Sequence, residues 1–165
     1  MLKPDFILNS VADIDVKFLM RIGARGLILD IDNTLAIPDE KTVPEEISLW
    51  IAQMKKCGVP MVLLSNNSAE RISSFAKLVD IPFVAKGGKP LKKGYVKAAE
   101  LLNIPIYRCA AVGDQLFTDI WGGNNAKAVT VLTMPFAKDQ TFFISIKRIL
   151  EKPLLKKYRR KNNDS

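Results

Sequence analysis

The sequence predicts an α/β protein in which a central parallel sheet lies between two layers of helices. Short apolar segments typical of buried strands alternate with longer segments whose apolar residues recur at helical spacing. Parallel strands need crossover connections, and the helices that supply them cover the two faces of the sheet. The chain of 165 residues has room for one such domain, which we place at residues 1–150, followed by a basic tail at 151–165.

The first part of the chain contains signals for two helices and two strands. Ser10 and Asp13 form a capping-box pattern at the start of a helix that Gly23 ends. A second such pattern, Thr42 with Glu45, precedes apolar residues at helical spacing. In order, we expect a helix at 11–22, a buried strand at 26–31, a helix that starts at 42–45 and ends at Gly58, and a strand at 59–64.

The rest of the chain repeats this alternation. The apolar residues of segments 68–79 and 90–102 each fall on one helical face, whereas the segments between the helices are short and apolar. In order, we expect a helix at 68–79, a strand at 81–85, a helix at 90–102, a strand at 107–112, a mostly helical segment at 115–125, a strand at 129–133 and a last helix at 138–150.

Composition excludes several kinds of site and location. Two cysteines and no histidine supply neither a disulfide framework nor a zinc site. Acidic residues and Pro4 interrupt the N-terminal segment where a signal peptide needs an apolar core, and no apolar run reaches the roughly 18 residues that span a bilayer. We therefore expect a cytoplasmic protein that is not exported.

Polar and charged side chains follow the predicted strands at the points where these strands end. Because the carboxyl ends of parallel strands meet at one edge of the sheet, these side chains should converge on one crevice. The acid pair after the first strand is weak evidence alone, since Asp-x-Asp-x-Thr also occurs by chance. The residues in question are Asp30 and Asp32, Ser65 and Asn66, Lys89, and Asp114 and Asp119.

This set of side chains suits the transfer of a phosphoryl group. Clustered carboxylates repel one another unless a cation joins them, and a site made only of oxygen ligands favours Mg²⁺. A lysine supplies further positive charge for a phosphate and for the charge that develops during its transfer.

Four segments of the chain resemble, in order, the four motifs of the haloacid dehalogenase (HAD) phosphatases. The resemblance implies a Rossmann-like three-layer sandwich, and segments 10–15 and 113–124 further resemble subclass IIIA, the YqeG-like group, which is similar to phosphatidylglycerophosphate phosphatases. The four segments are Asp30-Ile31-Asp32-Asn33-Thr34-Leu35, Ser65-Asn66-Asn67, Lys89-Pro90 and Gly113-Asp114-Gln115-Leu116-Phe117-Thr118-Asp119.

The resemblance also implies roles for individual residues. Asp30 would be the nucleophile that forms an aspartyl-phosphate, and Asp32 the general acid and then the general base. Asp30, Asp114 and the backbone carbonyl of Asp32 would hold Mg²⁺. Lys89 would pair with Asp30 and the phosphate. Lys86 is the rival for this role, and we prefer Lys89 because it precedes Pro90, which we expect to open a helix.

The remaining residues of the motifs would bind the phosphate or support the lysine. Thr34, Ser65 and Asn66 are expected to contact phosphoryl oxygens, and Asp119 would orient Lys89 or a metal-bound water. Ser65 as a helix cap and Asp119 as a surface acid are the plainer alternatives.

The intervals between the motifs leave little room for an inserted cap domain, so we expect a capless protein with an open site. An open site suits a phosphate carried on something large, such as a lipid headgroup, a protein or a nucleic-acid end. We expect a Mg²⁺-dependent phosphatase whose favoured substrate, by resemblance, is phosphatidylglycerophosphate. A phosphatase of a soluble metabolite or a phosphoprotein, and a non-catalytic binding protein that uses its basic tail, are the alternatives.

Basic residues concentrate at the end of the chain. Eight lysines and arginines and two acids lie at 145–165, so this segment carries six of the eight net positive charges. The plain interpretation is a last core helix and a flexible tail. The alternative is peripheral contact with the anionic inner face of a membrane, where each basic residue contributes about 1 kcal/mol. RNA would meet the same charge, although we consider nucleic acid a less suitable partner.

Overall fold

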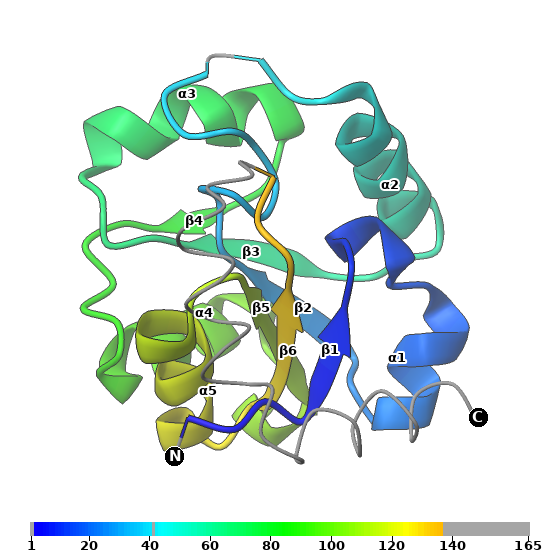
Figure 1. Cartoon of the computed structure of the whole chain (residues 1–165), viewed down its shortest axis with the longest axis vertical. Helices are drawn as coiled ribbons and strands as arrows, with labels where there is room; N and C mark the ends of the chain where they lie inside the picture. The colour runs from blue at the N-terminus through cyan, green and yellow to red at the C-terminus, as the bar shows by residue number, and fades with distance from the viewer. Residues whose placement is uncertain (1, 41, 137–165) are drawn as a thin grey trace.

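The computed structural model, which describes residues 2–40 and 42–136, has a six-stranded parallel sheet at its centre (Figure 1). The order of the strands in the sheet is β1-β6-β5-β2-β3-β4. The strands are β1 (Phe6–Leu8), β2 (Gly26–Leu29), β3 (Met61–Leu64), β4 (Phe83–Val84), β5 (Cys109–Gly113) and β6 (Val129–Thr133). The helices are α1 (Val16–Ile22), α2 (Glu45–Lys56), α3 (Ala69–Val79), α4 (Lys92–Leu102) and α5 (Trp121–Ala126), with a π-helical turn at Leu116–Ile120.

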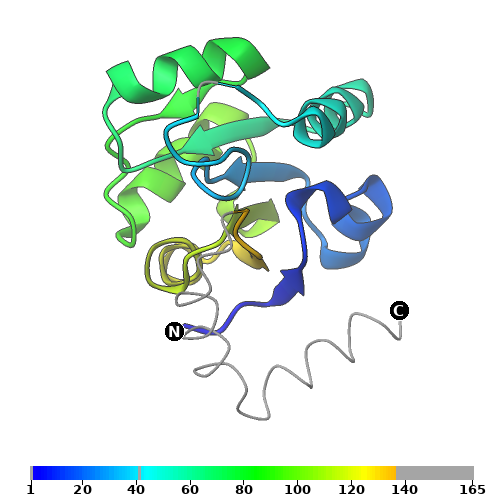
Figure 2. The same ribbon diagram turned by 45° about the horizontal axis from the view of Figure 1, so that its top comes forward.

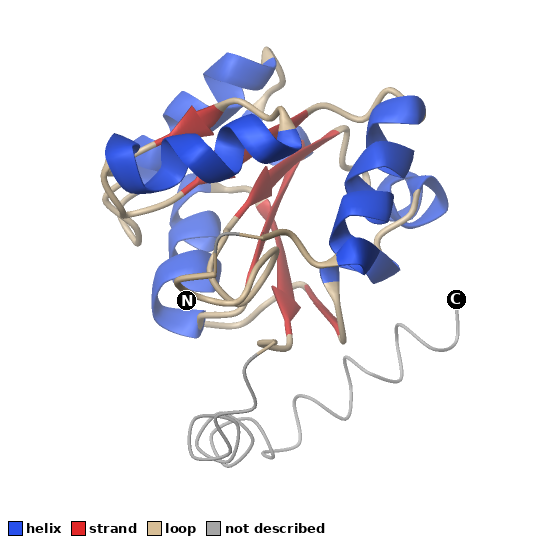
Figure 3. Cartoon of the chain, turned by 90° about the horizontal axis from the view of Figure 1, so that it is seen from above, coloured by secondary structure: helices blue, strands red, loops and turns tan. Residues whose placement is uncertain are grey.

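Helices cover both faces of the sheet, as Figures 2 and 3 show from two directions. Buried residues of α1, α2 and α3 pack with Leu27 and Leu29 of β2 in one cluster. Residues of α4 and α5 pack with Ile28, which lies between these two and points to the opposite face, in a second cluster. The predicted three-layer fold, with strands buried on both sides, is therefore confirmed.

Several predicted boundaries were wrong for identifiable reasons. The capping box of Ser10 and Asp13 begins a short 3-10 turn, and Asp15 caps α1 by accepting a hydrogen bond from the backbone N–H of Phe18 at 2.7 Å. Helix α4 begins at Lys92, so Pro90 precedes the helix rather than opening it. The predicted helix at 138–150 and the tail at 151–165 lie outside the described residues.

The order of the strands places the start of a crevice at the end of β2. The chain runs outward from β2 to β3 and β4 on one side, while β5, β6 and β1 lie on the other. Ligands of such sheets bind where the direction changes. In the described parts of the segments that link β2 to α2 and β3 to β4, α3 is the only helix, in keeping with the expected lack of a cap. No helix among residues 2–40 and 42–136 has the length and apolar character to cross a membrane.

Candidate active site

A buried lysine joins two of the acidic residues at the carboxyl edge of the sheet. Asp30 directly follows β2, and Lys89 lies between β4 and α4. The Lys89 Nζ donates to Asp30 Oδ1 at 2.8 Å and to Asp119 Oδ1 at 2.6 Å. The Thr34 hydroxyl donates to the other oxygen of Asp30 at 3.3 Å. Lys86, the rival for this role, is exposed.

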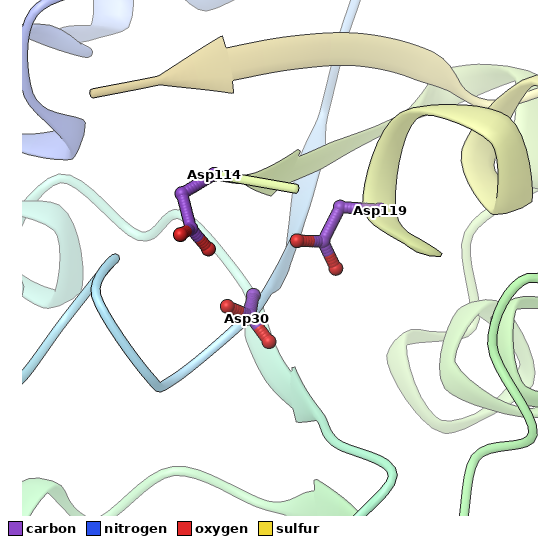
Figure 4. Close-up of side chains that lie close together, drawn as sticks. All are labelled: Asp30, Asp114 and Asp119. Atoms are coloured by element: carbon purple, nitrogen blue, oxygen red, sulfur yellow. The ribbon is translucent and has the colours of Figure 1, made fainter. Parts of the chain in front are cut away.

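Asp114 and Asp119 approach Asp30 from the segment after β5 (Figure 4). One carboxylate oxygen from each of the three residues lies within 4.8 Å of the others. The backbone N–H of Gln115 donates to Asp119 Oδ2 at 3.1 Å. A Cβ at Gly113 would lie 2.3 Å from the carboxylate of Asp119, so glycine is the residue that lets this carboxylate fold back over the end of β5.

Burial and mutual repulsion raise the pKa values of the acids in this cluster. The pKa of Asp114 is raised to about 8, first by burial and then by the charges of Asp30 and Asp119. The pKa of Asp119 is raised to about 6 by burial and by Asp30, against the lowering effect of Lys89. The pKa of Lys89 is also raised, because two carboxylates outweigh the burial that opposes its charge. The site therefore keeps its lysine charged, and this one positive charge does not balance three carboxylates.

The carboxylate cluster has the donor set of a divalent cation site. Asp114 is 2% exposed, and its Oδ1 has no hydrogen-bond partner. Leaving a buried charged oxygen unpaired is costly, so an oxygen in this state marks a place where a cation fits. Asp30 and Asp114 could hold such an ion, and their oxygens suit a hard cation. Asp119 lies in the same cluster and also pairs with Lys89.

Side chains of the segment after β3 form hydrogen bonds with Lys89 and with Asp32, the second aspartate of the first motif. The Asn66 side chain accepts from the backbone N–H of Lys89 at 2.8 Å and donates to its carbonyl at 3.1 Å. Asn67 Nδ2 donates to Asp32 Oδ2 at 3.2 Å. The hydroxyl of Ser65, which is buried, accepts from the backbone N–H of Asn67 at 3.1 Å. Asn66 thus positions Lys89 in this structure.

Asp32 lies at the edge of the cluster and lines a hollow of about 630 Å³ between the segment after β2 and helix α3. Its pKa is raised by burial and by the charge of Asp30, so it keeps its proton to a higher pH than an ordinary aspartate. Phe75 and Leu78 of α3 supply apolar surface to the hollow, and Arg71 supplies a cation among several acids. The hollow is therefore open space next to Asp32, the second aspartate of the Asp30 and Asp32 pair.

Two residues of the site escaped the sequence-based reasoning. Tyr95 lies on the apolar face of the helix that the sequence predicts at 90–102, and it is buried, but its hydroxyl donates to the carbonyls of Thr118 and Asp119 at 3.0 and 3.2 Å. It ties the π-helical turn to α4. Asn67 belongs to a recognised motif but had no assigned role. Neither contact has a sequence signal of its own, because each depends on which side chains the fold brings together.

Comparisons with known proteins agree with the family resemblance of the four motifs. Residues 14–127 match the model of the haloacid dehalogenase-like hydrolases. The chain belongs to this family. The match spans the acid pair after β2, the lysine and the acids after β5. It confirms the resemblance drawn from the four motifs and the prediction that the chain is an enzyme.

Two proteins whose names describe them as phosphatases are similar to this chain over nearly its whole length. The probable phosphatase YqeG of Bacillus subtilis is 31% identical over 160 residues, 97% of this chain and 93% of that protein. Phosphatidylglycerophosphate phosphatase 1 of Arabidopsis thaliana is 28% identical over 96% of this chain, but the chain spans only 48% of that protein. These relatives agree with two predictions from the sequence, namely that the chain is a phosphatase and that it resembles the YqeG-like group.

Solved structures of HAD proteins share the fold. The cobalt-bound deoxy-D-mannose-octulosonate 8-phosphate phosphatase of Haemophilus influenzae has a TM-score of 0.57 at 14% identity, over 77% of this chain and 75% of that one. A HAD family hydrolase of Deinococcus radiodurans has a TM-score of 0.55 at 13% identity, over 77% and 96%. At these identities the likeness concerns the fold alone.

Proposed function

We propose that this protein is a Mg²⁺-dependent phosphomonoester hydrolase that acts through an aspartyl-phosphate on Asp30. The observation that carries the proposal is the buried pairing of Asp30 with Lys89 beside Asp114, with a second acid, Asp32, two residues along the chain. A structural ion pair would need neither the extra buried acids nor Asp32.

The nucleophile and the proton donor come from the same loop. A carboxylate oxygen of Asp30 would attack the phosphorus while the bond to the leaving oxygen breaks, and Asp32 would give its proton to that oxygen. The raised pKa of Asp32 suits a group that must arrive protonated. In the second step Asp32 would take a proton from the water that attacks the phosphorus, which frees Asp30 and releases inorganic phosphate.

The other residues would hold the phosphoryl group and position the nucleophile. Lys89, which is 9% exposed and keeps its proton, would balance the charge of the phosphoryl oxygens. The hydroxyls of Thr34 and Ser65 are the further candidates for phosphoryl contacts, and Asn66 would act by holding Lys89. Mg²⁺, held by Asp30, Asp114 and the carbonyl of Asp32, would supply the positive charge that lets the carboxylates and a phosphate share one site.

For the substrate we propose phosphatidylglycerophosphate. The similarity to a phosphatidylglycerophosphate phosphatase and the lack of a cap among the described residues support this choice, because an uncapped site can reach a phosphate on a large carrier. A soluble phosphometabolite or a phosphoprotein is the alternative that the test includes.

The test is a measurement of phosphate release with Mg²⁺ from a panel of substrates. Phosphatidylglycerophosphate in mixed micelles is compared with sugar, nucleotide and peptide phosphates, with the Asp30→Asn variant as the blank for contaminating activity. A preference of at least tenfold in kcat/KM for the lipid supports the proposed substrate. A preference for a soluble phosphate rejects it, and no release from any substrate rejects the hydrolase.

A further inference from the structure

The segments that carry Lys89 and Asp119 inward also carry large apolar side chains outward. Leu91 is 69% exposed, Phe117 is 59% exposed and Trp121 is 40% exposed. Leu91 comes two residues after Lys89, while Phe117 and Trp121 lie two residues before and after Asp119. These exposed apolar side chains therefore stand beside the proposed active site rather than at a distant place on the surface.

The two segments lie against each other, as do helices α4 and α5 that follow them (Figure 1). Asn125 Nδ2 donates to the carbonyl of Pro90 at 3.3 Å, and the Tyr95 hydroxyl donates to the carbonyl of Thr118 at 3.0 Å. Trp121 precedes Asn125 by four residues and so lies on the same side of α5, the side that faces residues 90–91. Phe117 precedes Trp121 by four residues along the continuous helical turns at 116–126, so it lies on this side too, and Leu91, Phe117 and Trp121 belong to one surface.

This surface has positive charge without exposed acids in the segments that form it. Lys86, Lys92, Lys93 and Lys97 are exposed, and residues 86–97 contain no aspartate or glutamate. The one acid in residues 115–125 is Asp119, which is buried and paired with Lys89. We call these four lysines, together with Leu91, Phe117 and Trp121, the α4–α5 surface.

We propose that the α4–α5 surface docks on an anionic lipid bilayer and so brings the active site to phosphorylated headgroups. Lysines near an anionic bilayer each contribute about fivefold in binding, and exposed aromatic side chains prefer the interface between headgroups and acyl chains. The proposal rests on the proposed lipid substrate. A small soluble phosphate would be attracted by the lysines, but it would gain nothing from three exposed apolar side chains.

The two tryptophans of the chain make docking directly observable. Trp50 is 6% exposed and its indole N–H donates to the carbonyl of Ile14 at 2.8 Å, whereas Trp121 lies on the α4–α5 surface. Vesicles of phosphatidylglycerol and phosphatidylcholine should shift the fluorescence to shorter wavelengths, and brominated acyl chains should quench it. The Trp121→Phe variant should lose both responses, while it keeps the fluorescence of the buried Trp50.

Paired variants in the full chain measure the contribution of the surface to affinity. Leu91→Ser with Phe117→Ser should weaken vesicle binding at least tenfold, and Lys92→Gln with Lys93→Gln should weaken it about 25-fold. The matched controls replace exposed residues of the helices on the opposite face of the sheet and should bind as the unmodified chain does. They are Met20→Ser with Leu49→Ser, and Lys56→Gln with Lys77→Gln.

Turnover of p-nitrophenyl phosphate separates this inference from the proposed function. All these variants should turn it over within twofold of the unmodified chain, because none alters the proposed catalytic residues. A chain that binds vesicles through this surface but releases no phosphate would reject the hydrolase and not the docking. Unchanged vesicle binding in both surface variants would overturn the docking. It would also be overturned if these variants lost RNA binding or self-association but kept their affinity for vesicles.

Discussion

Replacing Asp114 by asparagine should make the metal-free protein more stable and the enzyme inactive. Asparagine has nearly the shape of aspartate but carries no charge, so the packing around the site is kept. Asp114 is 2% exposed and lies beside Asp30 and Asp119, and the lysine of the site already pairs with these two. Without a cation, the third carboxylate is therefore a charge that the fold does not compensate.

The size of the effect follows from the raised pKa. A change from the ordinary value of 3.8 to about 8 corresponds, at about 1.4 kcal/mol per pKa unit, to roughly 6 kcal/mol as an upper limit. Entry of water and rotation of the side chain relieve part of this cost, so we expect about 3 kcal/mol. Between pH 4 and pH 8 the folded chain binds more protons than the unfolded chain, and its stability therefore falls as the pH rises.

Urea unfolding in EDTA at pH 4.5 and at pH 8 measures this difference. The Asp114→Asn variant should match the unmodified chain at pH 4.5 and exceed it by about 3 kcal/mol at pH 8. Mg²⁺ at pH 8 should stabilise the unmodified chain and leave the variant unchanged, since the variant lacks a ligand. Equal stabilities in EDTA at pH 8 would refute the claim that the carboxylate of Asp114 is held at a cost.

Three further predictions concern the proposed chemistry and the tail. Asp30→Asn should abolish phosphate release while circular dichroism shows an intact fold, and full activity would remove Asp30 from its role. Asp32→Asn should lower kcat by a factor of 10² to 10⁴ and spare binding of a phosphate mimic with metal, as isothermal titration can show. Deletion of residues 153–165 should spare p-nitrophenyl phosphate turnover and weaken binding to anionic vesicles, whereas unchanged binding would show that this charge is not used.

The sequence predicted the order of most strands and helices, because helices of this length show apolar residues at a regular spacing and the short apolar segments between them are typical of buried strands. It missed β1, which has only three residues and pairs in parallel with β6, more than 120 residues later in the chain. No local pattern identifies so short a strand. Asp5, just before β1, helps to hold this edge strand against β6. Its backbone N–H donates to the hydroxyl of Thr130 at 3.0 Å, and its carboxylate accepts from the backbone N–H of Thr130 at 2.9 Å.

The candidate site was predictable as a set of residues but not as a set of contacts. Parallel strands place their carboxyl ends together, so Asp30, Lys89 and Asp114 could be grouped from their positions in the chain. The reason given for preferring Lys89, a helix opening at Pro90, was wrong. What places the lysine is the Asn66 side chain, which bonds both backbone groups of Lys89, and such a link between two loops has no periodicity to detect.

The charges of the site also predict the order in which its ligands bind. Asp30, Asp114 and Asp119 face a single buried lysine, so with all three ionised the cluster has a net charge of about −2 and repels a phosphate dianion. A divalent cation would neutralise this excess negative charge. Lys89 could then interact with the phosphate as well as with the carboxylates. Titration with vanadate, a phosphate mimic, should show binding with Mg²⁺ and at least a hundredfold weaker binding in EDTA at pH 8. Equal affinity in the two conditions would mean that the carboxylates are neutral at this pH and that the cation is not needed to admit the substrate.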